Sequence, residues 1–187
     1  MEQSELNILV EQCKRGDRNV FRRLVEEYQN MVFSLCLKML CNEEEAKDAV
    51  QNTFVAVWEN LERYDAGKGR FAIWVYTIAS RICLDDLRHR KKLLPLPDDE
   101  TVLRQYVSGR NGEQQLMNRE WASIVKVLAA DLSPRQHLVF TLSMLENRDY
   151  SEIEAITGLS ADKIKSNMYV ARQKIKEQLK RLGYGQK

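Results

Sequence analysis

Apolar residues recur at steps of three and four along most of the chain, which is the spacing typical of helices. A first long helix is predicted from an N-cap at Asp17 to near Cys41. A second begins at Asn42, where the spacing to Glu45 resembles a capping box. A glycine-bearing break at residues 64–70 precedes a third helix, which begins at Phe71 and runs into the basic residues 88–92. The pattern therefore predicts a helical N-terminal unit.

The helical pattern fails between residues 93 and 115, where prolines, acidic residues and glycines indicate a linker. Shorter helices follow. A capped helix start is predicted by Ser133 as N-cap, Pro134 at the first helical position and Gln136 three residues after the cap. Gly158 then separates a short helix from a last one that begins near Ala161. The predicted fold class is all-α, with two helical domains joined by a flexible linker and a helix-turn-helix in the C-terminal domain.

Composition narrows the class of protein. The 187 residues are 44% hydrophobic and 30% charged, with a formal net charge of only +2, so bulk charge does not indicate nucleic acid. No run approaches the ~20 apolar residues of a membrane span, and no signal pattern opens the chain, so we expect a cytoplasmic protein without membrane insertion. Its 4 cysteines form no C-x-x-C pair, and we expect reduced, mostly buried thiols rather than a redox or zinc sensor.

Positive charge is concentrated near the C-terminus, where residues 161–187 hold eight Lys or Arg against two acidic residues. In a helix-turn-helix the start of the second helix enters the major groove, so this charge can meet DNA phosphates. The alternative is a solvated amphipathic helix on a bundle. The duplex-reading candidates lie outside the apolar stripe of this helix or just before it: Ser160, Lys163, Lys165, Ser166, Asn167, Tyr169 and Arg172.

A second candidate site combines aromatic and basic residues around the segment 64–70. Single-stranded bases stack on aromatic rings at about 1–3 kcal/mol each, and basic side chains neutralise the phosphates. Tyr64 and Phe71 flank the segment, while Tyr76 and Thr77 lie off the apolar stripe and can face a ligand. Trp74 lies on the stripe and is expected in the core. The acidic outer face of the second helix is by itself only a solvated surface.

Ordered motifs in both halves of the chain resemble the extracytoplasmic-function sigma factors. The resemblance covers roughly residues 10–92 and 119–182. The matching residues are Gly16-Asp17, Glu45-Ala46-Lys47-Asp48, Gln51, Phe54, Phe71, Trp74-Val75-Tyr76, Ile78-Ala79, Asp85, Arg88, Leu132, Pro134-Arg135, Glu152-Ile153, Gly158, Ile164-Lys165-Ser166 and Ala171-Arg172. Departures at Asn52, Ile73, Arg81, Glu154 and Asn167 leave the preferred promoter sequence unreadable.

The resemblance implies a transcription initiation factor with no catalytic, metal or cofactor site. Residues 1–92 would form the sigma region 2 domain, 93–118 the linker and 119–187 the region 4 domain, which would read the minus-thirty-five element with the duplex-reading candidates. Expected partners are RNA polymerase core, through its beta and beta-prime subunits, promoter DNA and an anti-sigma factor. Implied polymerase contacts are Asp48, Gln51, Asn52, Val55 and Glu59. Implied minus-ten contacts are Tyr64, Lys68, Arg70, Phe71, Tyr76, Thr77, Ser80, Arg81 and Arg88.

Three other classes of protein remain as alternatives. A repressor or response-regulator-like protein would use only the helix-turn-helix and would need a dimer interface. An all-helical interaction protein, such as a sigma mimic, would bind a regulator without reading DNA. An enzyme is disfavoured because no Ser/His/Asp set, metal-ligand spacing or glycine-rich phosphate loop stands out.

Overall fold

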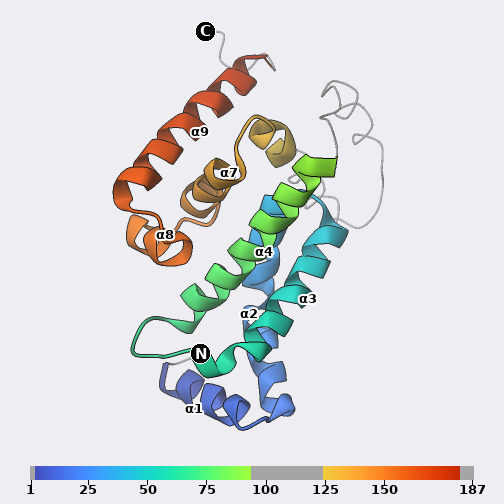
Figure 1. The fold of residues 1–187 in the computed structure, drawn as a ribbon, viewed down its shortest axis with the longest axis vertical. Coiled ribbons are helices and arrows are strands. Elements are labelled where there is room, and N and C mark those ends of the chain that lie inside the picture. The colour runs from blue at the N-terminus through green and yellow to red at the C-terminus, as the bar shows by residue number, and fades with distance from the viewer. Residues whose placement is uncertain (1–2, 94–123, 182–187) are drawn as a thin grey trace.

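A computed structural model describes residues 3–93 (the N-terminal half) and 124–181 (the C-terminal half). Every regular element within these ranges is helical (Figure 1), as predicted. Nearly all of the predicted linker lies outside these ranges. The N-terminal half contains α1 (Gln3–Lys14), α2 (Arg18–Leu40), α3 (Glu43–Glu59), η1 (Leu61–Arg63) and α4 (Phe71–Leu93). The C-terminal half contains helical residues 124–129, α7 (Pro134–Phe140), the π-helical turn η3 (Thr141–Leu145), α8 (Tyr150–Thr157) and α9 (Ala161–Arg181).

The predicted helix starts are confirmed by their side-chain caps. The carboxylate of Asp17 accepts hydrogen bonds from the backbone N–H groups at the start of α2, and Asn42 does the same for α3. Ser133 forms the complete capping box with Gln136. The suggested box at Asn42 is not reciprocal, because the Glu45 carboxylate pairs with an arginine of α4 instead.

Helix α1 was not predicted, although its signal is present in the sequence. Leu6, Leu9, Val10 and Cys13 follow the helical spacing and are all buried. They pack α1 against α2 and η1 at the end of the molecule where residues 64–70 lie. The short length of α1 and the polar residues between these positions concealed the pattern.

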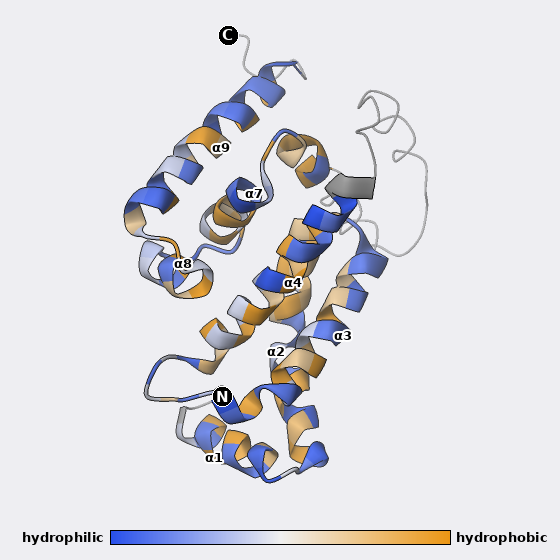
Figure 2. Ribbon diagram, in the orientation of Figure 1, coloured by the Kyte–Doolittle hydropathy of each residue, from blue (hydrophilic) through white to orange (hydrophobic). Residues whose placement is uncertain are grey.

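The core of the N-terminal half lies where α2, α3 and α4 pack on one another. Figure 2 shows apolar stretches in each of these helices, while α9 is mostly hydrophilic. Helix α4 also packs against α7 and α8, and α2 packs against η3. One cluster of buried apolar side chains therefore runs from α2–α4 into the C-terminal half, where it includes Leu138, Ile153 and Ile164.

The cysteines are free thiols, and Cys13, Cys36 and Cys83 are buried, in line with the sequence prediction. The Sγ atoms of Cys36 on α2 and Cys83 on α4 lie 3.7 Å apart inside the core. Burial raises the pKa of the Cys13 thiol to about 11 and that of Cys41 to about 12. The hydrogen bond to Cys36, with burial, raises the pKa of Cys83. These environments disfavour the thiolate, which is the reactive form.

We expect the native protein to resist a thiol reagent such as Ellman's reagent near neutral pH, and all 4 cysteines to react once it is unfolded. The measurement is absorbance against time with and without denaturant. As the pH rises from 9.0 toward 11, the unfolded chain loses its Cys13 proton first, so the folded state should lose stability in that window. Rapid reaction of a thiol in the native protein would contradict this assignment.

Candidate polymerase and nucleic-acid interfaces

The predicted polymerase contacts lie together on one open face of α3. Their spacing of three and four residues places them on the side opposite the buried Ala49, Phe54 and Val57. Val55 is 56% exposed, an apolar side chain surrounded by polar and acidic ones. The exposed members of this face, called the α3 face below, are Asp48, Gln51, Asn52, Val55 and Glu59.

The segment 64–70 is anchored by an aromatic cluster. Tyr64 and Phe71 are buried, with ring centroids 5.1 Å apart, and Trp74 lies 5.3 Å from Tyr64 and 5.7 Å from Phe71. The Tyr64 hydroxyl donates to the carbonyl of Gly69 at 3.1 Å. The expectation that Tyr64 and Phe71 present open ring faces is therefore wrong for this conformation, because packing of the segment onto α4 uses those faces.

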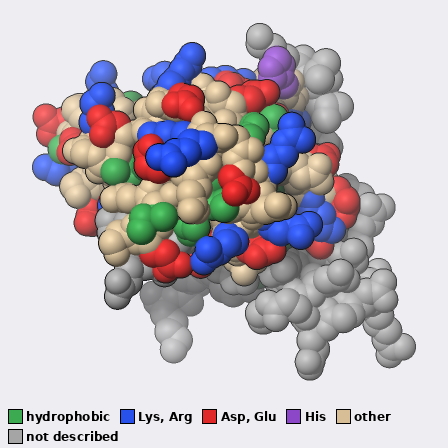
Figure 3. Space-filling view, turned by 90° about the horizontal axis from the view of Figure 1, so that it is seen from below, with side chains coloured by type: hydrophobic (Ala, Val, Ile, Leu, Met, Phe, Trp, Pro, Cys, Tyr) green, Lys and Arg blue, Asp and Glu red, His purple; other side chains and the backbone are tan. Residues whose placement is uncertain are grey.

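Charged side chains at the tip of the segment remain in solvent. Asp65 accepts a hydrogen bond from the backbone N–H of Gly67 at 2.9 Å, and this bond holds the pKa of Asp65 below its usual value. Lys68 lies 3.5 Å from Asp65, and Arg70 pairs with Glu152 of α8. Seen from the end that carries α1, basic and acidic side chains are interspersed (Figure 3), so no single sign of charge dominates there.

Tyr76 does not face solvent, contrary to the prediction. It is 1% exposed, and its hydroxyl donates to Glu146 at 2.8 Å. Arg148 donates to the same hydroxyl at 3.0 Å and lies 4.6 Å above the ring. Burial, and then the Glu146 carboxylate, raise the pKa of Tyr76. Since both partners follow η3, the C-terminal half of the chain itself covers this part of α4.

Glu146 is the centre of a polar contact between the two halves. Besides Tyr76, its carboxylate accepts from Lys38 at 2.6 Å and from Ser34 at 2.8 Å, both on α2. Lys38 also donates to the carbonyl of Leu145 at 3.0 Å. We call Ser34, Lys38, Tyr76, Glu146 and Arg148 the Glu146 network. Sequence reasoning missed this network because lone polar residues on a helix and in a turn carry no periodic signal.

The remaining minus-ten candidates on α4 lie beside α7 and α8. Thr77 donates to the carbonyl of Ile73 at 2.9 Å, and Ser80 is 2% exposed. Arg81 is exposed, and Arg88 pairs with Asp85 at 2.7 Å. The structure thus brings four of the predicted strand-contacting residues of α4 together on the side that faces the C-terminal half: Tyr76, Ser80, Arg81 and Arg88.

The C-terminal half forms a helix-turn-helix with an open second helix. Asp149 caps α8, and Gly158 adopts the left-handed φ of 68° that turns the chain toward α9. Ile164 and Met168 are buried, and Tyr169 on the other side is 67% exposed. The duplex-reading candidates other than Asn167 are exposed: Ser160, Lys163, Lys165, Ser166, Tyr169 and Arg172.

Asn167 is half-buried and tied to its own helix. Its side-chain amide donates to the carbonyl of Lys163 at 2.7 Å. A bidentate contact with a base would need this hydrogen bond to be exchanged.

In the described residues, no helix is long and apolar enough to cross a membrane.

Comparison with known proteins gives one family match in each half of the chain. Residues 24–93 match Sigma-70 region 2, and residues 124–175 match Sigma-70 region 4. The chain is 25% identical over 180 residues to the ECF RNA polymerase sigma factor SigW of Bacillus subtilis, covering 92% of this chain and 96% of SigW. It is 27% identical over 181 residues to the ECF RNA polymerase sigma-E factor of Escherichia coli, covering 93% and 94%.

Two solved structures share the fold. CnrH, in complex with the cytosolic domain of CnrY, has a TM-score of 0.65 at 22% identity, covering 92% of this chain and 96% of that one. The sigma factor RpoE of Bartonella quintana, in complex with the anti-sigma factor NepR, has a TM-score of 0.59 at 20% identity, covering 86% and 96%. With regions 2 and 4 in order and similarity along nearly the whole length of SigW and sigma-E, the chain belongs to the extracytoplasmic-function family of RNA polymerase sigma factors.

Proposed function

We propose that this sigma factor docks on RNA polymerase core through the α3 face and directs it to promoters. The single observation that carries the proposal is that the α3 face and the outer side of α9 are both open, one on each half of the chain. A docking surface and a duplex-reading surface can then be engaged together. Two modest contacts joined in one chain bind far better than either alone, because the second contact forms at a high effective concentration.

The division of labour follows the two family matches. Residues 1–92 serve as the region 2 domain and capture the minus-ten strand, 93–118 link, and 119–187 serve as the region 4 domain, which reads the minus-thirty-five duplex. Polymerase supplies the catalysis, so the protein acts as a cytoplasmic recognition subunit and not as an enzyme. An anti-sigma factor is its proposed regulator, since both structural neighbours are complexes, one of them with a protein named as an anti-sigma factor.

Strand capture requires the halves of the chain to separate. In the present arrangement Tyr76 contacts Glu146 and Arg148, and Arg70 contacts Glu152, so these side chains are occupied by the C-terminal half. We propose that docking on polymerase favours an open arrangement in which the α4 side becomes available to DNA. A partner can shift such an equilibrium only by its difference in affinity for the two arrangements.

The decisive experiment is reconstituted transcription. Purified core polymerase is supplied with DNA from upstream of the gene that encodes this protein. Transcription is run with and without the protein, and start sites are mapped by primer extension. Transcripts from a defined start that depend on the protein support the proposal. Binding to DNA without any polymerase-dependent start would favour a repressor, and binding to polymerase without a start would favour a sigma mimic.

Charge reversal on the α3 face should weaken docking. We expect Asp48→Lys to lower affinity for core polymerase at least about tenfold, or about 1.4 kcal/mol. The new ammonium group would face either a basic side chain of polymerase or no opposite charge in the contact. Surface plasmon resonance with immobilised core measures the effect. Glu62→Lys on η1 is the matched control, an exposed reversal outside the α3 face. Equal affinities for both variants would remove α3 from the contact.

Two substitutions on α9 should separate phosphate contact from base reading. Lys165→Ala should weaken DNA binding across sequences and lower the salt dependence by about one unit, as for one lost phosphate contact. Asn167→Ala should cost about 1–3 kcal/mol at one base position and relax preference there. Fluorescence anisotropy with a set of duplexes at several salt concentrations measures both, with Lys47→Ala on α3 as the control. If both changes act alike on every sequence, Asn167 reads no base.

A further inference from the structure

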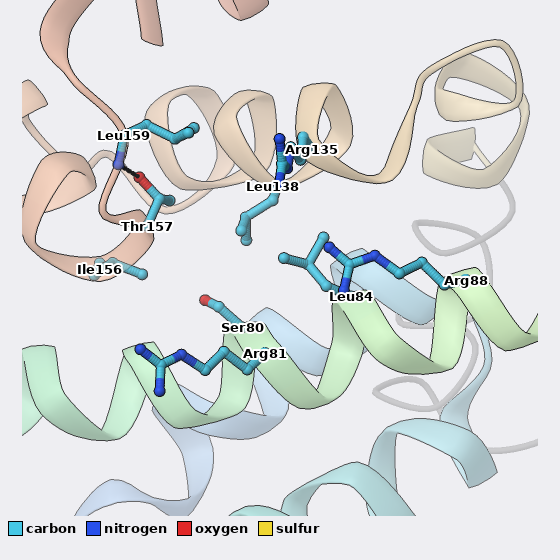
Figure 4. A pocket seen from close by; sticks show the side chains of 9 residues that line it. All are labelled: Ser80, Arg81, Leu84, Arg88, Arg135, Leu138, Ile156, Thr157 and Leu159. Atoms are coloured by element: carbon cyan, nitrogen blue, oxygen red, sulfur yellow. Dashed lines mark hydrogen bonds between the residues drawn. The ribbon is translucent and has the colours of Figure 1, made fainter. Parts of the chain in front are cut away.

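A cavity of about 170 Å³ lies between α4 and the α7–α8 pair (Figure 4). A single water needs only about 10–15 Å³ of such space, so this cavity can hold a polyatomic ligand. Both halves of the chain supply its lining. The lining residues are Ser80, Arg81, Leu84 and Arg88 on α4, Arg135 and Leu138 on α7, and Ile156, Thr157 and Leu159 at the end of α8.

The cavity contains a buried hydroxyl that has no partner within the described part of the chain. Ser80 is 2% exposed, its Oγ makes no hydrogen bond there, and Figure 4 shows this atom pointing from α4 toward α7 and α8. The neighbouring Thr157 differs, because its hydroxyl donates to Ile153 at 2.6 Å and accepts from Leu159 at 3.2 Å. Buried polar atoms are nearly always hydrogen-bonded, so the Ser80 hydroxyl is available to hydrogen-bond a polar molecule in the cavity.

The charge of the lining specifies the kind of ligand. Three arginines and no acidic residue are among the lining side chains. Arg88 is partly neutralised by Asp85 at 2.7 Å, whereas no ion pair of Arg81 or Arg135 is found among residues 3–93 and 124–181. Guanidinium groups bind oxyanions, and phosphate in particular, through paired N–H donors. A hydroxyl in the floor with exposed guanidinium groups at the rim therefore suits a compact oxyanion.

We propose that this cavity is a binding site for a small phosphate-bearing anion held between the two halves of the chain. The Ser80 hydroxyl donates to one phosphate oxygen, and Arg81 and Arg135 neutralise the charge from opposite walls. Because α4 supplies one wall and α7–α8 the other, the site exists only in the closed arrangement. The anion consequently stabilises the closed arrangement by mass action, and its effect grows with its concentration.

The test is isothermal titration calorimetry on the full chain with pyrophosphate, inorganic phosphate and a nucleoside triphosphate, against sodium chloride at equal ionic strength. We expect the phosphates to bind and chloride not to bind. Arg135→Gln should lower the affinity about tenfold, the usual loss for one charge-assisted hydrogen bond, and Ser80→Ala should lower it as well. Arg22→Gln on α2 makes the same charge change outside the lining and should leave the affinity unchanged.

The phosphate series distinguishes the source of the ligand. Tighter binding of the nucleoside triphosphate than of pyrophosphate identifies a nucleotide, and the reverse order identifies a free inorganic anion; both support the site. The proposal is overturned if no phosphate binds above the chloride control, or if Arg135→Gln and Arg22→Gln bind equally well. Arg135 is exposed, so its replacement should leave the fold intact, which circular dichroism verifies.

Discussion

Glu146→Gln should open the molecule and increase its affinity for single-stranded DNA by about tenfold. The substitution removes the charge that Lys38 faces at 2.6 Å and weakens the acceptor for Tyr76 at 2.8 Å. Breaking such a pair leaves the partner charge uncompensated. Since the Lys38 side chain is 22% exposed, we expect about 1–2 kcal/mol, which is less than for a fully buried pair. The closed arrangement, in which the two halves are in contact, loses this much stability relative to the open one.

The gain in affinity follows from the open fraction. A ligand that binds only the open arrangement has an apparent dissociation constant equal to its intrinsic constant divided by the open fraction, so about 1.4 kcal/mol in favour of opening gives about tenfold. Small-angle X-ray scattering measures the expansion, and anisotropy with single-stranded DNA of mixed sequence measures the affinity. Glu26→Gln, an exposed change of the same kind on α2, is the control. If Glu146→Gln matches that control in both measurements, the Glu146 network does not hold the halves together.

Phe71→Ala should remove about 3–5 kcal/mol of stability, the usual loss for truncating a buried phenylalanine. Phe71 is fully buried at the start of α4, with ring centroids 5.3 Å from Tyr28 and 5.1 Å from Tyr64. Its removal leaves a cavity in the cluster that fixes the segment 64–70. Because domains of this size are stable by only about 5–15 kcal/mol, this is a large share of the total.

Urea unfolding followed by circular dichroism measures the change for Phe71→Ala. Tyr169→Ala is the matched aromatic truncation at a position that is 67% exposed, and it should fall within about 0.5 kcal/mol of the unaltered protein. A loss below about 1 kcal/mol for Phe71→Ala would show that the segment and α4 can repack around the missing ring.

Local chemistry made the helix limits predictable from the sequence. Asp17, Asn42 and Ser133 are caps because their side-chain oxygens accept from nearby backbone N–H groups, an interaction that needs no tertiary information. Gly158 is likewise a turn because of its own backbone freedom. The open faces of α3 and α9 follow from the periodicity, since the apolar stripe of each helix identifies the buried side and hence the exposed one.

The contacts between the halves could not be predicted in this way. Tyr76 lies off the apolar stripe of α4, so the pattern indicated an exposed ring, and only the placement of Glu146 and Arg148 beside it explains its burial. Tyr64 and Phe71 were expected to bind a ligand because aromatic rings stack on bases, but their rings pack on one another and on Trp74. Side chains at such sites have two available partners, the rest of the chain and the ligand, and sequence alone does not rank them.

The unbroken apolar core has a consequence for the behaviour of the protein in concentrated solution. Buried side chains continue from α2–α4 into Leu138, Ile153 and Ile156 of the other half. Separating the halves would transfer part of this surface to water, where each square ångström of apolar area costs about 25 cal/mol. A molecule opened without a partner would therefore be prone to self-association, and raising its concentration would favour aggregates over single open copies. The open form should last only when diluted or when another protein surface covers the exposed apolar area.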